Sequence, residues 1–299
     1  MQWRTYAQLV RLPNVFTAVS DVLLGTLAAG SWRDQPGQSA ALLAASIMLY
    51  SAGMVWNDYF DIEVDRHERP FRPLPSGRVS LRSARRLGTA LVVLGALFAA
   101  LSGWQSKRWN TEPILLAGLL IIAILVYDGW LKKYTVGPVI MGLCRFLNIL
   151  MATSLAGSNL AVAERFHLAT VIGTYIVGVT WFARNEAGHS SLIQLRAAML
   201  TIIIAIFLGL SIALHRPTGS VPIIYPYLIA TFLIVILVPL VRASRRPDPK
   251  SVQKAVKYSI LGLIIFDAVI ATLYVGPLGL LLLLLLIPAL FLGRVFYST

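Results

Sequence analysis

Long apolar runs separated by short polar segments dominate the chain. A helix needs about 20 predominantly apolar residues to cross roughly 30 Å of hydrocarbon. The pattern predicts nine such spans, or ten if the final apolar run also crosses. The predicted spans are 12–31, 40–57, 87–106, 113–130, 136–158, 166–183, 196–214, 221–241 and 256–275, followed by the run 277–296. The chain is therefore predicted to be an all-α, polytopic membrane protein.

Composition supports a membrane location and excludes other classes of protein. Hydrophobic residues make up 57% of the 299 residues and charged residues 13%, about half the charged fraction of a soluble domain. Too few charges remain to cover a soluble surface, so a soluble enzyme and a disordered chain are excluded. The single cysteine, Cys144, rules out a disulfide-stapled domain. No linker rich in Gly, Ser or Pro divides the chain, and residues 1–299 are predicted to form one membrane domain.

The formal net charge of +13 is distributed unevenly among the predicted loops. If the spans alternate in direction, 19 of the 26 basic residues lie on the side of the N-terminus. Because cationic loops of membrane proteins stay mainly in the cytoplasm, we expect the N-terminus and the loops of the candidate site there, in a bacterial inner membrane. The positive charge then requires no nucleic acid, and the loop 242–257 is expected to touch anionic lipid.

The chain contains a candidate internal repeat. The segment Arg11-Leu-Pro-Asn14 is similar to Arg145-Phe-Leu-Asn148, and one predicted span later Asn57-Asp58 is matched by Asn185-Glu186. The repeat predicts two four-span units of the same orientation, residues 1–134 and 135–250 approximately. Chance similarity between apolar helices is the alternative, although polar positions match as well as apolar ones.

Three carboxylates follow the second predicted span. Asp58, Asp61 and Asp65 lie within an arc of about 60° on a helix, where like charges repel. Mg²⁺ would remove this conflict, since it takes one or two carboxylates together with phosphate oxygens. The Arg-rich segment 66–78 adds guanidinium groups suited to a diphosphate. The alternative is a solvated helix end with its own salt bridges.

These residues, together with two other segments, form a recognisable set. The set comprises Asn57, Asp58, Asp61 and Asp65, then Arg72-Pro-Leu-Pro-Ser-Gly77, Tyr127 with Leu131 and Lys132, and Arg11-Leu-Pro-Asn14. In these motifs the chain resembles the UbiA superfamily of intramembrane prenyltransferases. The resemblance implies nine helices, as two four-helix bundles and a further helix, around a central cavity. It also implies Mg²⁺-dependent transfer of a prenyl group from a prenyl diphosphate to a lipophilic, often aromatic acceptor.

The resemblance also implies roles for individual residues. Asp58, Asp61 and Asp65 would hold Mg²⁺ against the diphosphate, and Asn57 would orient these ligands. The phosphate oxygens would be bound by Arg69, Arg72 and Lys132. Tyr127 would stabilise positive charge at the allylic carbon through its ring, or else be an interfacial aromatic residue of the kind common at helix ends.

Further polar residues lie inside predicted spans. Arg145 and Asn148 are expected to face a cavity rather than lipid, and we place them with the donor-binding residues. Asp21 and Asp267 lie deeper, either as functional carboxylates or as hydrogen-bonded structural ones.

The second half of the chain departs from the family pattern. A second carboxylate-rich motif is expected after the sixth span, but Glu186 is the only carboxylate there, and His189 stands where the repeat predicts Asp. Glu186 is a candidate ligand for a second Mg²⁺. His189 is a candidate base for the acceptor, with an interfacial His as the alternative.

Three functions remain compatible with the sequence. The first is prenyl transfer, which the intact first motif favours. The second is a family member with altered or lost chemistry that binds or moves a hydrophobic metabolite, which the depleted second motif favours. The third is an unrelated secondary transporter, which explains the segment 72–77 poorly.

Overall fold

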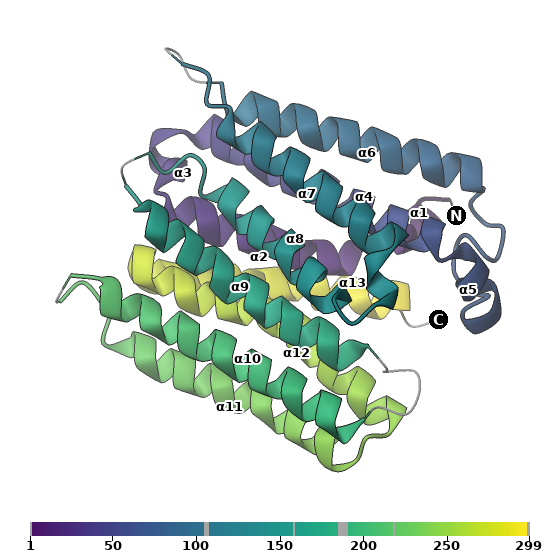
Figure 1. The fold of residues 1–299 in the computed structure, drawn as a ribbon. Helices are drawn as coiled ribbons and strands as arrows, with labels where there is room; N and C mark the ends of the chain where they lie inside the picture. Colours follow the sequence, from purple (N-terminus) through teal and green to yellow (C-terminus); the bar gives the residue numbers. More distant parts are fainter. Residues whose placement is uncertain (1, 105–107, 158, 185–190, 218, 298–299) are drawn as a thin grey trace.

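The computed structural model describes residues 2–104, 108–157, 159–184, 191–217 and 219–297, and every regular element in these ranges is a helix. Figure 1 shows the long helices lying side by side as one bundle. The long helices are α2 (Leu12–Ala28), α4 (Pro36–Phe60), α6 (Leu81–Ser102), α7 (Glu112–Gly129), α8 (Gly137–Ala152), α9 (Val162–Ala183), α10 (Leu192–Ile212), α11 (Ile224–Arg245) and α12 (Pro249–Val275). The shorter ones are α1 (Gln2–Leu9), α3 (Ser31–Asp34), α5 (Ile62–Glu68), η1 (Leu131–Lys133), η2 (Ala213–His215), η3 (Gly276–Leu285) and α13 (Leu286–Tyr297).

Helix length and composition agree with a membrane protein. Seven helical segments of the described chain are long and apolar enough to cross a bilayer. The predicted spans 12–31 and 136–158 appear as shorter apolar helices, α2 and α8. Each helix ends at a turn a few residues before the end of the predicted span. The all-α membrane fold is confirmed, whereas the number of crossings and the internal repeat stay predictions.

The last two apolar runs form a hairpin. Gly276 joins them with φ 60° and ψ −147°, a combination open essentially only to glycine. The chain turns back there, so that η3 packs against α12, and α13 packs against α2. The run 277–296 therefore lies beside α12 and α2 and returns toward the end of the bundle that holds α1 and α5 (Figure 1).

Helices α2 and α8 lie at the centre of the bundle. Helix α2 contacts α4, α8, α12 and α13, and α8 contacts α2, α4, α7 and α9. Small residues permit this packing: a Cβ atom on Gly142 of α8 would lie 2.6 Å from the carbonyl oxygen of Gly173 of α9. Close backbone approach through small residues is typical of helix association in membranes.

One end of the bundle gathers the segments that carry the predicted motifs. Helix α4 ends at Phe60 and α5 follows at once; the C-terminal end of α4 and the whole of α5 lie at the end of the bundle that also holds the N-terminus (Figure 1). Leu74 and Val79, in the loop after α5, are buried in one cluster with Leu9 and Val55. This apolar contact anchors the loop that contains Arg72.

Candidate active site

A cavity of about 310 Å³ lies between α2, α4, α7 and α8. Its residues come from the predicted motifs and from the apolar helices between them: Arg11, Ala18, Ser46, Leu49, Tyr50, Gly53, Met54, Asn57, Arg69, Leu120, Ile124, Tyr127, Asp128, Met141, Cys144, Arg145, Asn148 and Ala183. Along α4 the lining runs from Asn57 to Ser46, eleven residues apart, or about 16 Å of helix. The cavity therefore extends from the motif well into the apolar interior.

Two of the three predicted carboxylates share one guanidinium group. Arg72 Nη1 lies 2.7 Å from Asp65 Oδ2 and 3.4 Å from Asp58 Oδ1, and both carboxylates are buried. The backbone remains nearly helical between them, since the Asp61 amide donates to the Asn57 carbonyl and the Asp65 amide donates to the Asp61 carbonyl. Asp58 and Asp65 thus face the same side, as their spacing predicts.

Asp61 has a different partner. Its Oδ1 lies 2.7 Å from Lys132 Nζ on η1. This ion pair joins the end of α4 to the segment that follows α7. The pair brings the element that contains Tyr127 and Lys132 next to the first motif, as the resemblance implies.

Arg11 is the residue that places the N-terminal segment in the site. Its Nη2 donates to Asp58 Oδ1 at 3.0 Å and to Asn57 Oδ1 at 3.2 Å. Its backbone has φ 49° and ψ 51°, the left-handed conformation, at the junction of α1 and α2. Such a conformation costs of order 1–3 kcal/mol in a non-glycine residue and is concentrated at functional sites.

Asp128 is a further carboxylate of the site. It is buried, lines the cavity and accepts a hydrogen bond of 2.9 Å from Asn57 Nδ2. Asn57 thus lies between Arg11 and Asp128, with its oxygen toward the cation and its amide toward the carboxylate. This arrangement fixes the orientation of the Asn57 side chain.

Arg69 and Tyr127 also line the cavity. Within the described ranges Arg69 forms no ion pair, whereas Arg11, Arg72 and Lys132 each contact a carboxylate. Arg69 is therefore a cation whose charge is not already balanced by a described side chain of the site.

Arg145 and Asn148 lie deeper and contact side chains of their own chain. Arg145 forms an ion pair with Asp21 at 2.6 Å and donates to Thr17 Oγ1 at 2.8 Å. Asn148 accepts from Ser46 Oγ at 2.8 Å and donates to Asp21 Oδ2 at 3.3 Å. Both residues line the cavity, as expected. Their polar groups are nevertheless engaged with Asp21, Thr17 and Ser46, which places them with a structural network.

Comparison with known proteins agrees with this arrangement. The model of the UbiA prenyltransferase family matches residues 18–261. The chain belongs to this family. The resemblance inferred from the motifs is therefore confirmed.

The sequence match to individual curated relatives covers only part of each protein. A digeranylgeranylglyceryl phosphate synthase from Sulfurisphaera tokodaii is 32% identical over 149 residues, 50% of this chain and 51% of the relative. One from Methanocaldococcus jannaschii is 29% identical over 164 residues, 49% of this chain and 58% of the relative. The match spans about half the length of these curated relatives. Both are archaeal, so the expectation of a bacterial membrane has no support from them.

Solved structures of the family share the fold. A structure of a digeranylgeranylglyceryl phosphate synthase has a TM-score of 0.64 at 22% identity and covers 92% of this chain and 98% of that chain. A UbiA homologue from Archaeoglobus fulgidus, bound to GPP and Mg²⁺, has a TM-score of 0.61 at 16% identity and covers 89% and 99%. At these identities the likeness concerns the fold alone.

Two predictions about metal ligands are not decided by the structure. Among the described residues, no three acidic, His or Cys side chains lie close enough together to hold one ion. Arg72 pairs with Asp58 and Asp65, whereas Lys132 pairs with Asp61. Their shared ligation of Mg²⁺ stays a prediction. Glu186 and His189 lie outside the described residues.

Sequence reasoning did not assign site roles to Arg11 and Asp128. Arg11 lies in the repeated segment at the start of α2, and that match with Arg145 was a signal that its side chain has a specific partner. Asp128 directly follows Tyr127 at the end of an apolar run. A carboxylate at that position is costly in a membrane protein unless it faces a cavity or a partner.

Proposed function

We propose that this protein is an intramembrane prenyltransferase that moves a prenyl group from a prenyl diphosphate to a lipophilic acceptor, with Mg²⁺. The observation that carries the proposal is the cavity itself. Arg11, Asn57, Arg69 and Asp128 line it together with apolar side chains such as Leu120. A charged head and an apolar tail, as in a prenyl diphosphate, suit such a lining.

The polar residues fit Mg²⁺ by their chemistry. Arg11 Nη2 already lies between the side-chain oxygens of Asn57 and Asp58, so this position accommodates positive charge between hard oxygen ligands. Asp58, Asp61 and Asp65 would hold the ion, with Glu186 as a further ligand inferred from sequence. When bound, Mg²⁺ would neutralise the charge that develops on the departing diphosphate.

The cationic side chains would bind the phosphate oxygens. Arg69 forms no ion pair within the described ranges and lines the cavity, so its guanidinium group is the first candidate. Arg72 and Lys132 flank the carboxylates and would add charge-assisted hydrogen bonds. Together they would orient the diphosphate at the mouth of the cavity.

The apolar walls would protect the allylic cation. Leu49, Leu120 and Ile124 line the cavity beside the motif and keep water from the reacting carbon, where it would otherwise form an alcohol. The ring of Tyr127, also in the lining, would stabilise the positive charge.

Asp128 would accept the proton that the acceptor loses. It faces the cavity and its described partner is the neutral amide of Asn57, so its carboxylate is not paired with a described cation. A general base must lie within reach of the proton that it removes, and Asp128 lies at the junction of the charged and apolar lining. His189, inferred from sequence, is the second candidate for this role.

The acceptor that we favour is a lipophilic glyceryl phosphate. Relatives about 30% identical are named digeranylgeranylglyceryl phosphate synthases, and their name describes a glyceryl phosphate with two geranylgeranyl groups. The aromatic acceptor implied by the sequence resemblance is the second candidate. We place the reaction at the cytoplasmic face of the membrane, where the loop charges predict the motif to lie.

A membrane assay tests the proposal. Radiolabelled prenyl diphosphates of several chain lengths are supplied to the reconstituted protein with a glyceryl phosphate lipid or an aromatic acceptor, in the presence of Mg²⁺ or EDTA. The expected result is a labelled product with the glyceryl phosphate that disappears with EDTA. If no donor is consumed with any acceptor while an isoprenoid co-purifies, the protein is a binding member of the family.

A further inference from the structure

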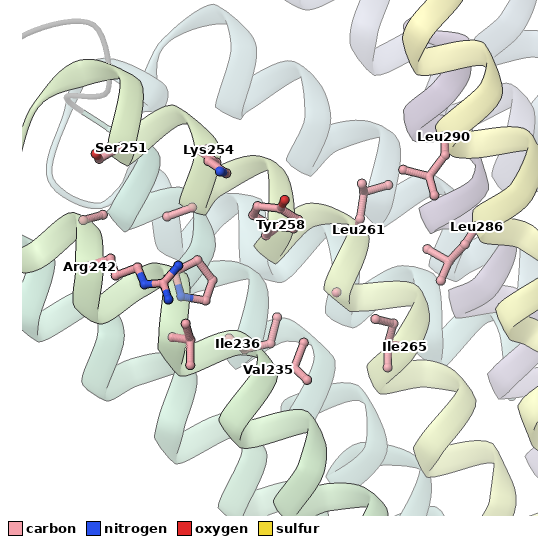
Figure 2. Close-up of a pocket in the computed structure, with 15 residues that line it drawn as sticks. Val235, Ile236, Arg242, Ser251, Lys254, Tyr258, Leu261, Ile265, Leu286 and Leu290 are labelled. Carbon is pink, nitrogen blue, oxygen red and sulfur yellow. The ribbon is translucent and has the colours of Figure 1, made fainter.

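A second cavity, of about 500 Å³, lies between α11, α12 and α13. It shares no lining residue with the candidate active site. Figure 2 shows Arg242 and Lys254 at one end and Leu261, Leu286 and Leu290 at the other. We refer to it as the α11–α13 groove; one end is cationic and the other apolar.

The cationic end has little negative charge around it. Within the described ranges neither Arg242 nor Lys254 forms an ion pair, and Lys254 Nζ lies 6.0 Å from the centre of the Tyr258 ring. Asp248 is the only acidic residue between positions 242 and 257, and its side chain caps α12 by accepting from the Ser251 amide at 2.9 Å. The hydrogen bonds from Ser251 lower the pKa of Asp248, which keeps this carboxylate charged and engaged in the cap.

The length of the groove matches one leaflet of a bilayer. From Lys254 to Ile265 the lining follows α12 for eleven residues, about 16 Å of helix. Half of a hydrocarbon core of roughly 30 Å is about 15 Å. Helix α12 is part of an apolar segment long enough to cross the membrane, so the apolar end of the groove lies at the depth of lipid chains.

The groove also lies at a defined end of the protein. Arg242 is near the end of α11 and Lys254 near the start of α12, at the end of the bundle that also holds α5 (Figure 1). Basic pockets between transmembrane helices on the cytoplasmic side bind anionic lipid head groups. The predicted orientation places this groove on that side.

We propose that the α11–α13 groove binds an anionic membrane phospholipid. The phosphate lies between Arg242 and Lys254, and one hydrocarbon chain follows Tyr258 and Leu261 toward Leu290. Binding is non-covalent and independent of the transferase site. The lipid fills a groove that protein side chains leave open between α12 and α13.

Native mass spectrometry of the full chain in detergent tests this proposal, with phosphatidylglycerol and phosphatidylcholine as probes. The wild-type protein is expected to retain phosphatidylglycerol preferentially. The double variant Arg242→Gln/Lys254→Gln is expected to bind it about 30-fold more weakly, from about fivefold for each cation near an anionic head group, with phosphatidylcholine unaffected.

The matched control is Arg246→Gln/Lys257→Gln. It removes the same charge from the same segment, both side chains are exposed, and neither lines the groove. Phosphatidylglycerol binding is expected to stay within about threefold of wild type, since these charges are outside the site. An equal loss in both double variants would instead indicate general attraction to the basic segment and would overturn the proposal.

A second pair of variants tests the apolar end without changing charge. Leu290→Trp places a larger side chain in the groove, whereas Leu281→Trp places one on the exposed surface outside it. Only the first is expected to release phosphatidylglycerol. Unchanged binding in Leu290→Trp, or displacement of the lipid by a soluble prenyl diphosphate, would contradict a phospholipid site.

Discussion

Around α2, α4 and α7 the helices enclose a cavity lined by charged side chains, whereas between α9, α11 and α12 aromatic rings fill the interior. In the second region the rings of Phe232 and Phe266 stack with centroids 4.9 Å apart, and Tyr175 lies 5.3 Å from Phe266. All three are fully buried. The cavity region therefore keeps polar groups around an unfilled space, whereas the aromatic region is filled and gains packing contacts.

The difference indicates that the cavity region serves activity and the aromatic region serves stability. Buried charges such as those of Asp58 and Asp65 cost solvation energy and persist here with Arg partners. The rings of the aromatic region carry no charge, and they support the helices that flank the cavity. We therefore expect substitutions in the cavity region to alter activity and substitutions in the aromatic region to alter stability.

The largest effect is expected from Asp58→Asn in the cavity region. The amide keeps the shape of the side chain but loses the charge that faces Arg11, Arg72 and the proposed Mg²⁺. Product formation from labelled prenyl diphosphate should fall by about 10³-fold, the order associated with lost electrostatic stabilisation. The matched control is Glu63→Gln, because Glu63 is an exposed carboxylate five residues away that pairs only with Arg66 among the described residues. Activity of Asp58→Asn within tenfold of this control would contradict the site.

The next effect is expected in the aromatic region. Phe266→Ala removes a ring that contacts Tyr175 and Phe232 and should lower the free energy of unfolding by about 3 kcal/mol or more. Unfolding in detergent, monitored by circular dichroism, measures this free energy. The control Phe207→Ala changes a side chain that is 57% exposed, and it should lower the free energy of unfolding far less. The activity of each folded molecule should stay close to wild type, and a selective loss of turnover in Phe266→Ala would break the division between the regions.

A smaller effect is expected from Asp128→Asn. The amide oxygen can still accept from Asn57, so donor binding should persist while proton removal from the acceptor is lost. Turnover should fall about 100-fold, the lower range for a general base, and the KM for the prenyl diphosphate should change little. Steady-state kinetics with the donor varied measures both quantities. A raised donor KM with unchanged turnover would place Asp128 in donor binding instead.

Much of the fold follows from local properties of the sequence. The helices could be predicted because each apolar run is long enough to cross hydrocarbon, and the position of the first motif followed from its place after the run 40–57. The hairpin at Gly276 could not be predicted, because it depends on a backbone conformation open essentially only to glycine and on the packing of η3 against α12. Periodicity alone does not show where an apolar run turns back or which helices it packs against.

The site was predictable only in part, because some of its contacts also depend on how the helices pack. The pairing of Asp58 with Asp65 follows from spacing on one helix. The contact of Arg11 with Asp58 and that of Asn57 with Asp128 join residues 47 and 71 positions apart. Such contacts depend on how α2, α4 and α7 rotate and pack against one another, which composition and spacing do not determine.

The smallest and most specific effect is expected at Arg11, where charge and backbone strain can be separated. Arg11→Gly and Arg11→Ala both remove the guanidinium group that contacts Asn57 and Asp58. Loss of these charge-assisted hydrogen bonds should lower activity about tenfold in both variants. The left-handed backbone at this position costs alanine about 1 kcal/mol and glycine almost nothing.

Arg11→Gly should therefore be more stable to unfolding than Arg11→Ala by about 1 kcal/mol at equal activity. Paired activity assays and detergent unfolding of the two variants measure this difference. If Arg11→Gly and Arg11→Ala differ in activity but not in stability, the left-handed backbone at position 11 positions a group of the site other than the Arg11 side chain. Equal activity with unequal stability would show that the left-handed backbone at the junction of α1 and α2 affects stability and not the reaction, so that this junction contributes to the cavity region through the Arg11 side chain.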